Sequence, residues 1–286
     1  MRIFLIIPIL FIFLASCSNS NDFDIPQISK LEKLEEHSNQ FIKGIYSYDN
    51  GIHVAIGFGI ANSIMVEGDG GNIIIDTTDD VSQAKEVLSE FQKINQNPIK
   101  AIIYTHNHGD HVFGASEFYN SQEEKPLVIA HSTTAEKVEK ILGIINPIIT
   151  LRSGKMFGTN LDDDELINVG LGPYLSAGRT SPGYIAPTMT FEKELKLELA
   201  GHKVELYHAP GETDDQLFVW FPELSALMPG DNFYTTFPNL YTIRGTSHRD
   251  VIGWVNSIDK MRSLDPQYLF PSHTMPIVGE EISNAL

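Results

Sequence analysis

Residues 106–111 read His-Asn-His-Gly-Asp-His, which places three imidazoles and one carboxylate within six positions. They directly follow Ile99–Tyr104, an apolar run with the pattern of a buried strand. In an extended segment, side chains at i and i+2 point to the same side. His106 and His108 can therefore hold one ion between them.

The second half of this run offers a second pair of ligands. Gly109 permits a sharp turn, after which Asp110 and His111 project in another direction and can reach a second ion nearby. Neutral imidazole and carboxylate at this density suit zinc-like divalent ions. The alternative is a polar surface loop in which histidines occur by chance.

Composition narrows the class of protein. The chain has 286 residues, a net charge of −17 and 42% hydrophobic residues, enough for one large domain or two ordinary ones. Nucleic-acid binding needs a basic face, so nucleic acid is not the expected main partner. The single cysteine excludes an internal disulfide in the mature chain.

The first residues have the pattern of a targeting segment. A positive start at Arg2 precedes the apolar run Ile3–Leu14, which is too short for a typical membrane span. Leu-Ala-Ser-Cys then resembles a bacterial lipoprotein cleavage site. We expect residues 1–16 to be a lipoprotein signal peptide, and Cys17 to carry the lipid at the head of a polar tether, residues 17–40. The alternative is an ordinary secretory signal.

Ser18 bears on where such a lipoprotein would be sorted. In enteric-type bacteria, the absence of an acidic residue after the lipidated cysteine favours the outer membrane over the inner one. The expected location is therefore the bacterial cell envelope. The protein would be anchored to the membrane by its N-terminal lipid and would face the periplasm, in an oligomeric state that the sequence leaves open.

Residues 41–286 have the pattern of one catalytic domain. Strand patterns, an amphipathic helix, more strands and a helix occur twice over, which predicts two sheets between helices. A Gly- and Pro-rich excursion with weak periodicity occupies residues 149–188. The predicted helices are 81–94, 132–142 and 248–264, and the predicted strands are 41–49, 51–59, 61–69, 72–77, 99–104, 127–130, 194–199, 203–208, 217–221, 226–228 and 268–270.

The pattern H-x-H-x-D-H after a strand resembles the metallo-β-lactamase superfamily, and residues 41–279 can be aligned with its fold. The resemblance implies an α+β chain folded as the metallo-β-lactamase-type αβ/βα four-layer sandwich, with a two-metal site at one edge. It also implies that Asp76, at the end of an apolar run, orients a metal ligand by hydrogen bonding. The alternative for Asp76 is a plain helix cap.

The resemblance also implies three downstream ligands: Glu212 in His-Ala-Pro-Gly-Glu, Asp231 in Pro-Gly-Asp and His273 in Pro-Ser-His. Their alternatives are a surface glutamate, a turn aspartate and a surface or capping histidine. Asp231 would bridge two Zn²⁺ or other divalent ions. The first ion would have the ligands His106, His108 and Glu212, and the second would have Asp110, His111 and His273.

Glutamate at position 212 departs from most of the superfamily, in which a histidine is expected. The added negative charge would hold the first ion more tightly and make it a weaker Lewis acid. This disfavours the β-lactamase and glyoxalase branches. It favours the class III alkylsulfatases, a branch with acidic ligands at such positions.

Residues 238–245, Pro-Asn-Leu-Tyr-Thr-Ile-Arg-Gly, carry the resemblance to alkylsulfatases most clearly. It implies that Asn239 and Arg244 hold the sulfate group, with Tyr241 and the 149–188 excursion also on the substrate side. Arginine offers a planar fork of donors that matches tetrahedral oxyanions. The alternative for Arg244 is a structural ion pair. Phe157 stands where the family has a tyrosine that contacts sulfate.

The predicted function is a binuclear-metal hydrolase that cleaves a small anionic sulfate ester with a metal-activated water. Asp110, Asp231 and Arg244 are the candidate catalytic residues. Asp231 is shorter than the family's usual glutamate, and the resemblance covers the catalytic domain of longer enzymes. The alternatives are another hydrolase of the superfamily, acting on a β-lactam, lactone, thioester or phosphoester, and a metal- or anion-binding lipoprotein without turnover.

Overall fold

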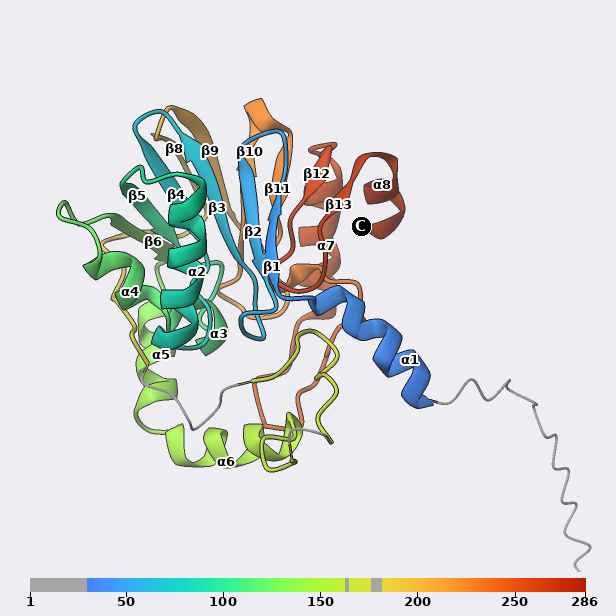
Figure 1. The fold of residues 1–286 in the computed structure, drawn as a ribbon. Helices are drawn as coiled ribbons and strands as arrows, with labels where there is room; N and C mark the ends of the chain where they lie inside the picture. Colours follow the sequence, from blue (N-terminus) through green and yellow to red (C-terminus); the bar gives the residue numbers. More distant parts are fainter. Residues whose placement is uncertain (1–29, 163–164, 176–181) are drawn as a thin grey trace, which may run out of the picture.

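A computed structural model describes residues 30–162, 165–175 and 182–286, which form two facing sheets with helices outside them (Figure 1). The predicted signal peptide and the lipidation site at Cys17 lie outside the described residues. The first sheet has the strand order β1-β2-β3-β4-β5-β6-β7. Its strands are β1 Gly44–Ser47, β2 Ile52–Ile56, β3 Ser63–Gly68, β4 Gly71–Ile75, β5 Ile99–Ile103, β6 Leu127–His131 and β7 Met189–Phe191.

The second sheet has the order β13-β12-β11-β10-β9-β8. Its strands are β8 Glu194–Leu199, β9 His202–His208, β10 Leu217–Phe221, β11 Ala226–Met228, β12 Tyr268–Leu269 and β13 Ile277–Val278. The helices are α1 Lys30–His37, α2 Val81–Ile94, α3 Gly109–Val112, α4 Ala115–Asn120, α5 Thr134–Leu142, α6 Asn146–Met156, α7 Val251–Arg262 and α8 Ile282–Ala285.

Three apolar clusters fill the spaces between the layers. One lies between the two sheets and includes Ile103 and Phe270. A second lies between the first sheet and α2, α4 and α5, and a third between the second sheet and α7. Helices, sheet, sheet and helix make four layers, so the predicted αβ/βα sandwich is confirmed.

Strand direction brings the expected ligands to one edge. β4 and β5 are parallel, so Asp76 and residues 106–111 leave the first sheet at the same end. In the second sheet β11 and β12 are parallel, and β9 has the same direction because β10 is antiparallel to both β9 and β11. Glu212, Asp231 and His273 therefore follow strands that end at a common edge.

The helix predicted at residues 81–94 is present with those bounds, as α2. Its N-cap is Asp80, whose side chain accepts from the backbone N–H groups of Ser82 and Gln83 and so satisfies two of the free donors at the helix start.

The predicted start of the excursion at residue 149 does not coincide with the end of an element. Residue 149 lies inside α6, which has a proline in its first turn. Sequence periodicity did not reveal this helix because its apolar side chains are not on a buried face: Ile148 is 56% exposed and Leu151 is 63% exposed.

The segment predicted as a tether, residues 17–40, already contacts the domain before residue 41. The Asn168 amide donates to the Leu34 carbonyl oxygen at 2.8 Å and to the Ser38 hydroxyl at 2.8 Å. The side-chain oxygen of Gln40 accepts from the Met275 backbone N–H at 3.3 Å. These are contacts between residues far apart in the chain, which local polarity does not predict.

Among the described helices, none is both long and apolar enough to cross a membrane.

Replacing Phe270 tests the packing between the sheets. Phe270 is fully buried and its ring contacts Tyr48 with centroids 4.9 Å apart. We expect Phe270→Ala to lower the free energy of unfolding by about 3–5 kcal/mol because it leaves a cavity. Phe237→Ala is the matched control, since Phe237 is 87% exposed, and should change it by less than about 0.5 kcal/mol. Denaturant titration measures both, and equal effects would contradict the packing described here.

Candidate metal centre

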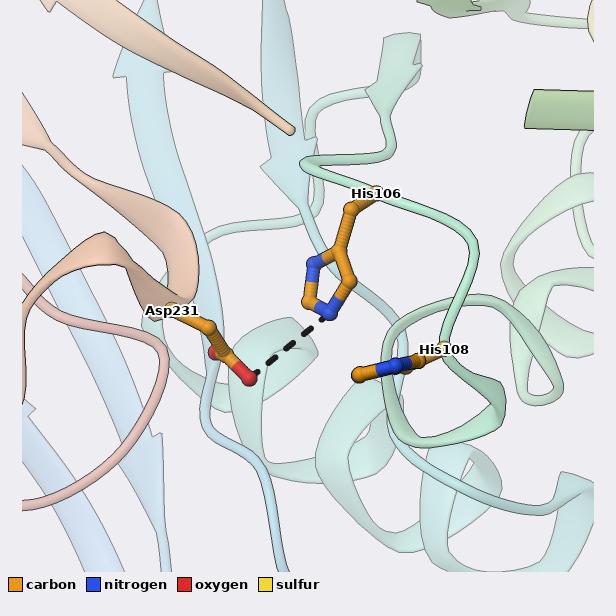
Figure 2. A group of neighbouring side chains, drawn as sticks. All are labelled: His106, His108 and Asp231. Atoms are coloured by element: carbon orange, nitrogen blue, oxygen red, sulfur yellow. Dashed lines mark ion pairs between the residues drawn. The ribbon is translucent and has the colours of Figure 1, made fainter. Parts of the chain in front are cut away.

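His106, His108 and Asp231 form the first group of candidate ligands (Figure 2). All three are buried, and their ligand atoms lie within 4.8 Å of one another. His106 and His108 follow β5 in the first sheet, while Asp231 follows β11 in the second, so the group lies where the two sheets meet. The His106 Nε2 atom is 3.7 Å from Asp231 Oδ2.

A second group consists of Asp110, His111 and His273, whose ligand atoms also lie within 4.8 Å of one another. The Asp110 Oδ2 atom lies 3.4 Å from His111 Nε2 and 3.5 Å from His273 Nε2. Asp231 Oδ2 is also close to this group, 3.4 Å from His111 Nε2 and 3.2 Å from His273 Nε2. One carboxylate thus faces both groups, which is the arrangement expected of a bridging ligand.

The short helix α3 separates the two pairs of ligands in the 106–111 run. His108 precedes it with extended backbone, while Asp110 and His111 lie in its single turn. At Gly109, where the sequence predicted a sharp turn, the structure has the first residue of this short helix. The change from extended to helical backbone aims the two pairs at different positions.

Three histidines are oriented through the nitrogen that faces away from the site. Each donates Nδ1–H, so that Nε2 faces the ligand groups: His106 to the Thr105 hydroxyl at 3.0 Å, His111 to Asp76 at 2.7 Å and His273 to the Ile60 carbonyl oxygen at 2.8 Å. Such contacts fix the tautomer and ring orientation that metal coordination needs.

Asp76 anchors this arrangement. Its carboxylate accepts from the Thr105 backbone N–H and hydroxyl, both at 2.9 Å, from the Ser272 hydroxyl at 2.7 Å, and from His111. It is fully buried and adopts a left-handed φ of 57°. The structure thus places Asp76 behind a ligand, where sequence analysis expected it.

Several buried atoms in this centre have no hydrogen-bond partner within the described part of the chain. They are His106 Nε2, His111 Nε2, Asp231 Oδ1 and Glu212 Oε2. A buried polar atom left without a partner is costly, so their convergence calls for a bound group. Imidazole and carboxylate donors in two clusters fit divalent metal ions.

The pKa values of the histidines are also consistent with bound divalent ions. Burial lowers the pKa of His106 to about 4, so its imidazole is neutral and able to ligate. Burial also lowers the pKa of His111, but Asp231 and Asp110 outweigh it and hold that pKa well above its usual range. The second group therefore favours a positive charge among its carboxylates.

Glu212 lies beside the first group but is not part of either cluster. Its Oε1 is 3.9 Å from His108 Nδ1, and the same oxygen accepts from the buried guanidinium of Arg249. Burial and Asp231 raise the pKa of Glu212 to about 7, while Arg249 acts in the opposite direction. Sequence analysis did not identify Arg249 as a site residue, because its contact with Glu212 is visible only in the fold.

A cavity of about 930 Å³ opens beside the ligand groups. Arg244, Asn239 and Phe157 line it, as predicted for substrate-side residues. The Arg244 guanidinium donates to His108 Nε2 at 3.2 Å, at the wall next to the first group. Side chains from α5, α6 and neighbouring segments also line the cavity. The apolar ones include Ile141, Ile145, Ile149, Met156, Val169 and Leu171, and the polar ones include Lys137, Lys140 and Asn146.

The structure does not place Tyr241 with the other predicted substrate-side residues. Its side chain is 69% exposed and is not among the residues that line the cavity. Neighbouring side chains in the irregular segment 238–245 point in different directions, and at this point Thr242 is the buried one. The motif alone cannot show which of its residues face the substrate.

Comparison with known proteins identifies the family. The family model described as the Metallo-beta-lactamase superfamily matches residues 56–273. The chain therefore belongs to the metallo-β-lactamase superfamily, in agreement with the four-layer fold and the H-x-H-x-D-H ligands.

Several of the proteins to which the chain is similar are alkylsulfatases. A linear primary-alkylsulfatase of Pseudomonas sp. is 38% identical over 223 residues, which cover 76% of this chain and 42% of that protein. An alkyl/aryl-sulfatase of Saccharomyces cerevisiae is 26% identical over 259 residues, covering 86% and 39%. In fold, the chain is similar to the secondary alkylsulfatase Pisa1 from Pseudomonas sp., with a TM-score of 0.78, 23% identity and coverage of 85% and 40%. The chain thus spans less than half of each relative's length.

Asp76→Asn tests the support of the ligands. The amide keeps the size of the side chain but replaces one acceptor oxygen with a donor that faces other donors. We expect zinc affinity to fall about 10–100-fold, as is usual when the group behind a ligand is altered. Competition with a chromophoric chelator measures it. Asp69→Asn, on an exposed turn, is the control, and equal affinities in the two variants would show that Asp76 does not support the centre.

Proposed function

We propose that this chain is a two-zinc hydrolase of sulfate esters. Its alkylsulfatase relatives, the two adjacent ligand clusters and the cavity beside them support the proposal. His106, His108 and Glu212 would hold the first ion, and Asp231 would bridge the two. Asp110, His111 and His273 would hold the second.

The position of Arg244 is the observation that favours an anionic substrate. The candidate ligands include three carboxylates, from Asp110, Glu212 and Asp231, which by themselves repel an anion. Arg244 places a guanidinium at the cavity wall, within hydrogen-bonding distance of a ligand histidine. An entering sulfate group would take over those donors, and the planar fork suits its oxygens.

The other residues around the cavity have complementary tasks. Zinc ions held by these ligands would supply a nucleophile derived from water at neutral pH and Lewis-acid stabilisation of negative charge. Asn239 offers an uncharged amide donor to the sulfate group. The apolar side chains on the wall formed by α5 and α6 would accommodate the organic part of the ester. Phe157 contributes to that wall and, unlike tyrosine, donates no hydrogen bond.

A substrate panel tests the proposal. The zinc-loaded protein, with its metal content measured, would be assayed on an alkyl sulfate, nitrocefin, a lactone, a thioester and a phosphate monoester. We expect sulfate release to be the fastest reaction. Faster turnover of another ester would assign the protein to a different branch of the superfamily, and a metal-loaded protein that turns over none would be a binder.

Arg244→Ala separates sulfate recognition from metal binding. Removing a donor that stabilises developing negative charge should lower kcat/KM for the sulfate ester about 10²–10³-fold. Zinc content should remain that of the unmodified protein, because Arg244 is not a ligand. Arg262→Ala is the control, since the Arg262 side chain is 54% exposed and far along α7. Unchanged turnover in Arg244→Ala would remove the basis for a sulfate substrate.

We further propose that Cys17 anchors the protein in the bacterial envelope, with the domain facing the periplasm. The apolar run Ile3–Leu14 and the following Leu-Ala-Ser-Cys support this. The anchor would keep the hydrolase at a membrane surface while leaving the catalytic domain in the aqueous phase.

Cys17→Ser tests the anchor. In a Gram-negative host, we expect the unmodified protein in the membrane fraction and the variant outside it, because a thiol is needed for lipid attachment. Fractionation with immunoblotting measures the distribution, and sucrose-gradient separation distinguishes outer from inner membrane. Ser18→Ala is the control and should remain membrane-bound; membrane retention of Cys17→Ser would argue for another mode of attachment.

A further inference from the structure

Arg249 connects the two halves of the site. It is only 4% exposed, and its guanidinium donates to Glu212 Oε1 through one terminal nitrogen and to the Asn239 backbone carbonyl oxygen through the other. Glu212 faces the first ligand group, while Asn239 lines the substrate cavity. One side chain thus contacts a candidate metal ligand and a candidate substrate ligand at once.

The residues around Arg249 fix its two partners from other directions. The Glu212 backbone N–H donates to the Asn232 side-chain oxygen at 3.1 Å, and the Asn239 N–H donates to the Tyr234 hydroxyl at 3.3 Å. The Trp254 ring lies 6.0 Å from the guanidinium carbon, and its indole N–H donates to the Asn232 carbonyl oxygen at 2.9 Å. Arg249 therefore occupies a defined place between loops from the second sheet and α7.

The charge of Arg249 matters as much as its shape. Glu212 is 8% exposed, and its buried carboxylate is close to that of Asp231. The adjacent guanidinium places the opposite charge within hydrogen-bonding distance of the Glu212 carboxylate. A neutral side chain at position 249 would leave Glu212 buried beside Asp231 without its compensating charge.

We propose that Arg249 is a positioning residue that sets the placement of the Glu212 carboxylate at the metal centre and of Asn239 at the substrate cavity. Although Arg249 also lines the cavity, its guanidinium hydrogen bonds go to these two residues, and it acts through them. The inference rests on the proposed function for its substrate half, whereas its metal half requires only that the centre binds zinc.

The test is a pair of double-mutant cycles. Arg249→Met and Arg249→Lys are made in the unmodified protein, in Glu212→Gln and in Asn239→Ala. Zinc affinity is measured by competition with a chromophoric chelator, and inorganic sulfate affinity by calorimetry on zinc-loaded protein. Circular dichroism and denaturant titration establish whether each variant is folded. If Arg249→Met does not fold, Arg249→Lys is used in its place.

We expect Arg249→Met to weaken zinc binding about 10–100-fold and Arg249→Lys to weaken it less, because lysine keeps the charge but not the fork. The zinc effect should largely disappear in Glu212→Gln, and the sulfate effect should largely disappear in Asn239→Ala, since Arg249 acts through these residues. Arg262→Met is the control for loss of a positive charge and should change neither affinity.

Two results would overturn the proposal: zinc affinity of Arg249→Met equal to that of the unmodified protein, or losses that simply add in the Glu212→Gln background. A protein that binds zinc but neither binds sulfate nor hydrolyses its esters would refute the proposed substrate. In that case the zinc cycle still decides the role of Arg249, so the two failures are distinguishable.

Discussion

The carboxylate of Asp76 is the interaction on which the rest of the centre depends. It receives hydrogen bonds from the segment after β5, from the segment after β12 and from a ligand histidine in α3. It thereby joins the ends of strands from both sheets at one buried point. Removing a charge from this position would leave several donors without an acceptor in a place that water cannot reach.

The centre is built by accumulating negative charge where burial alone would oppose it. Asp110 and Asp231 lie among histidines, and Glu212 lies against a buried arginine. Burial by itself raises the pKa of Asp231, yet His273 and His111 hold it well below its usual range. Asp231 is thus kept anionic in the interior by its histidine neighbours, a state that a divalent ion would stabilise further.

Much of this could be predicted from sequence because the informative signals are local. The run at 106–111 places four candidate ligands within six residues, and α2 shows its helical period and its Asp80 cap directly. Strand ends followed by short acidic or histidine motifs indicated Asp76, Asp231 and His273 through family resemblance. Each of these signals fits within a few consecutive residues.

The rest depends on contacts between distant segments. The role of Arg249 is recognisable only in the folded chain, where it contacts Glu212, 37 positions away in the sequence. The exposure of Tyr241 follows from the path of an irregular segment, and α6 lacks the one-sided apolar pattern that would identify a helix. No local rule of propensity or periodicity contains this information.

The way Arg249 holds residue 239 has a consequence for how specificity could diverge. The contact is made to the backbone carbonyl oxygen, so the anchoring of this loop does not depend on which side chain position 239 carries. A substitution there could alter what the cavity recognises while the loop stays attached to the metal centre. Position 239 is therefore a place where a different ligand preference could be selected, for example in a library, without disturbing the candidate metal centre.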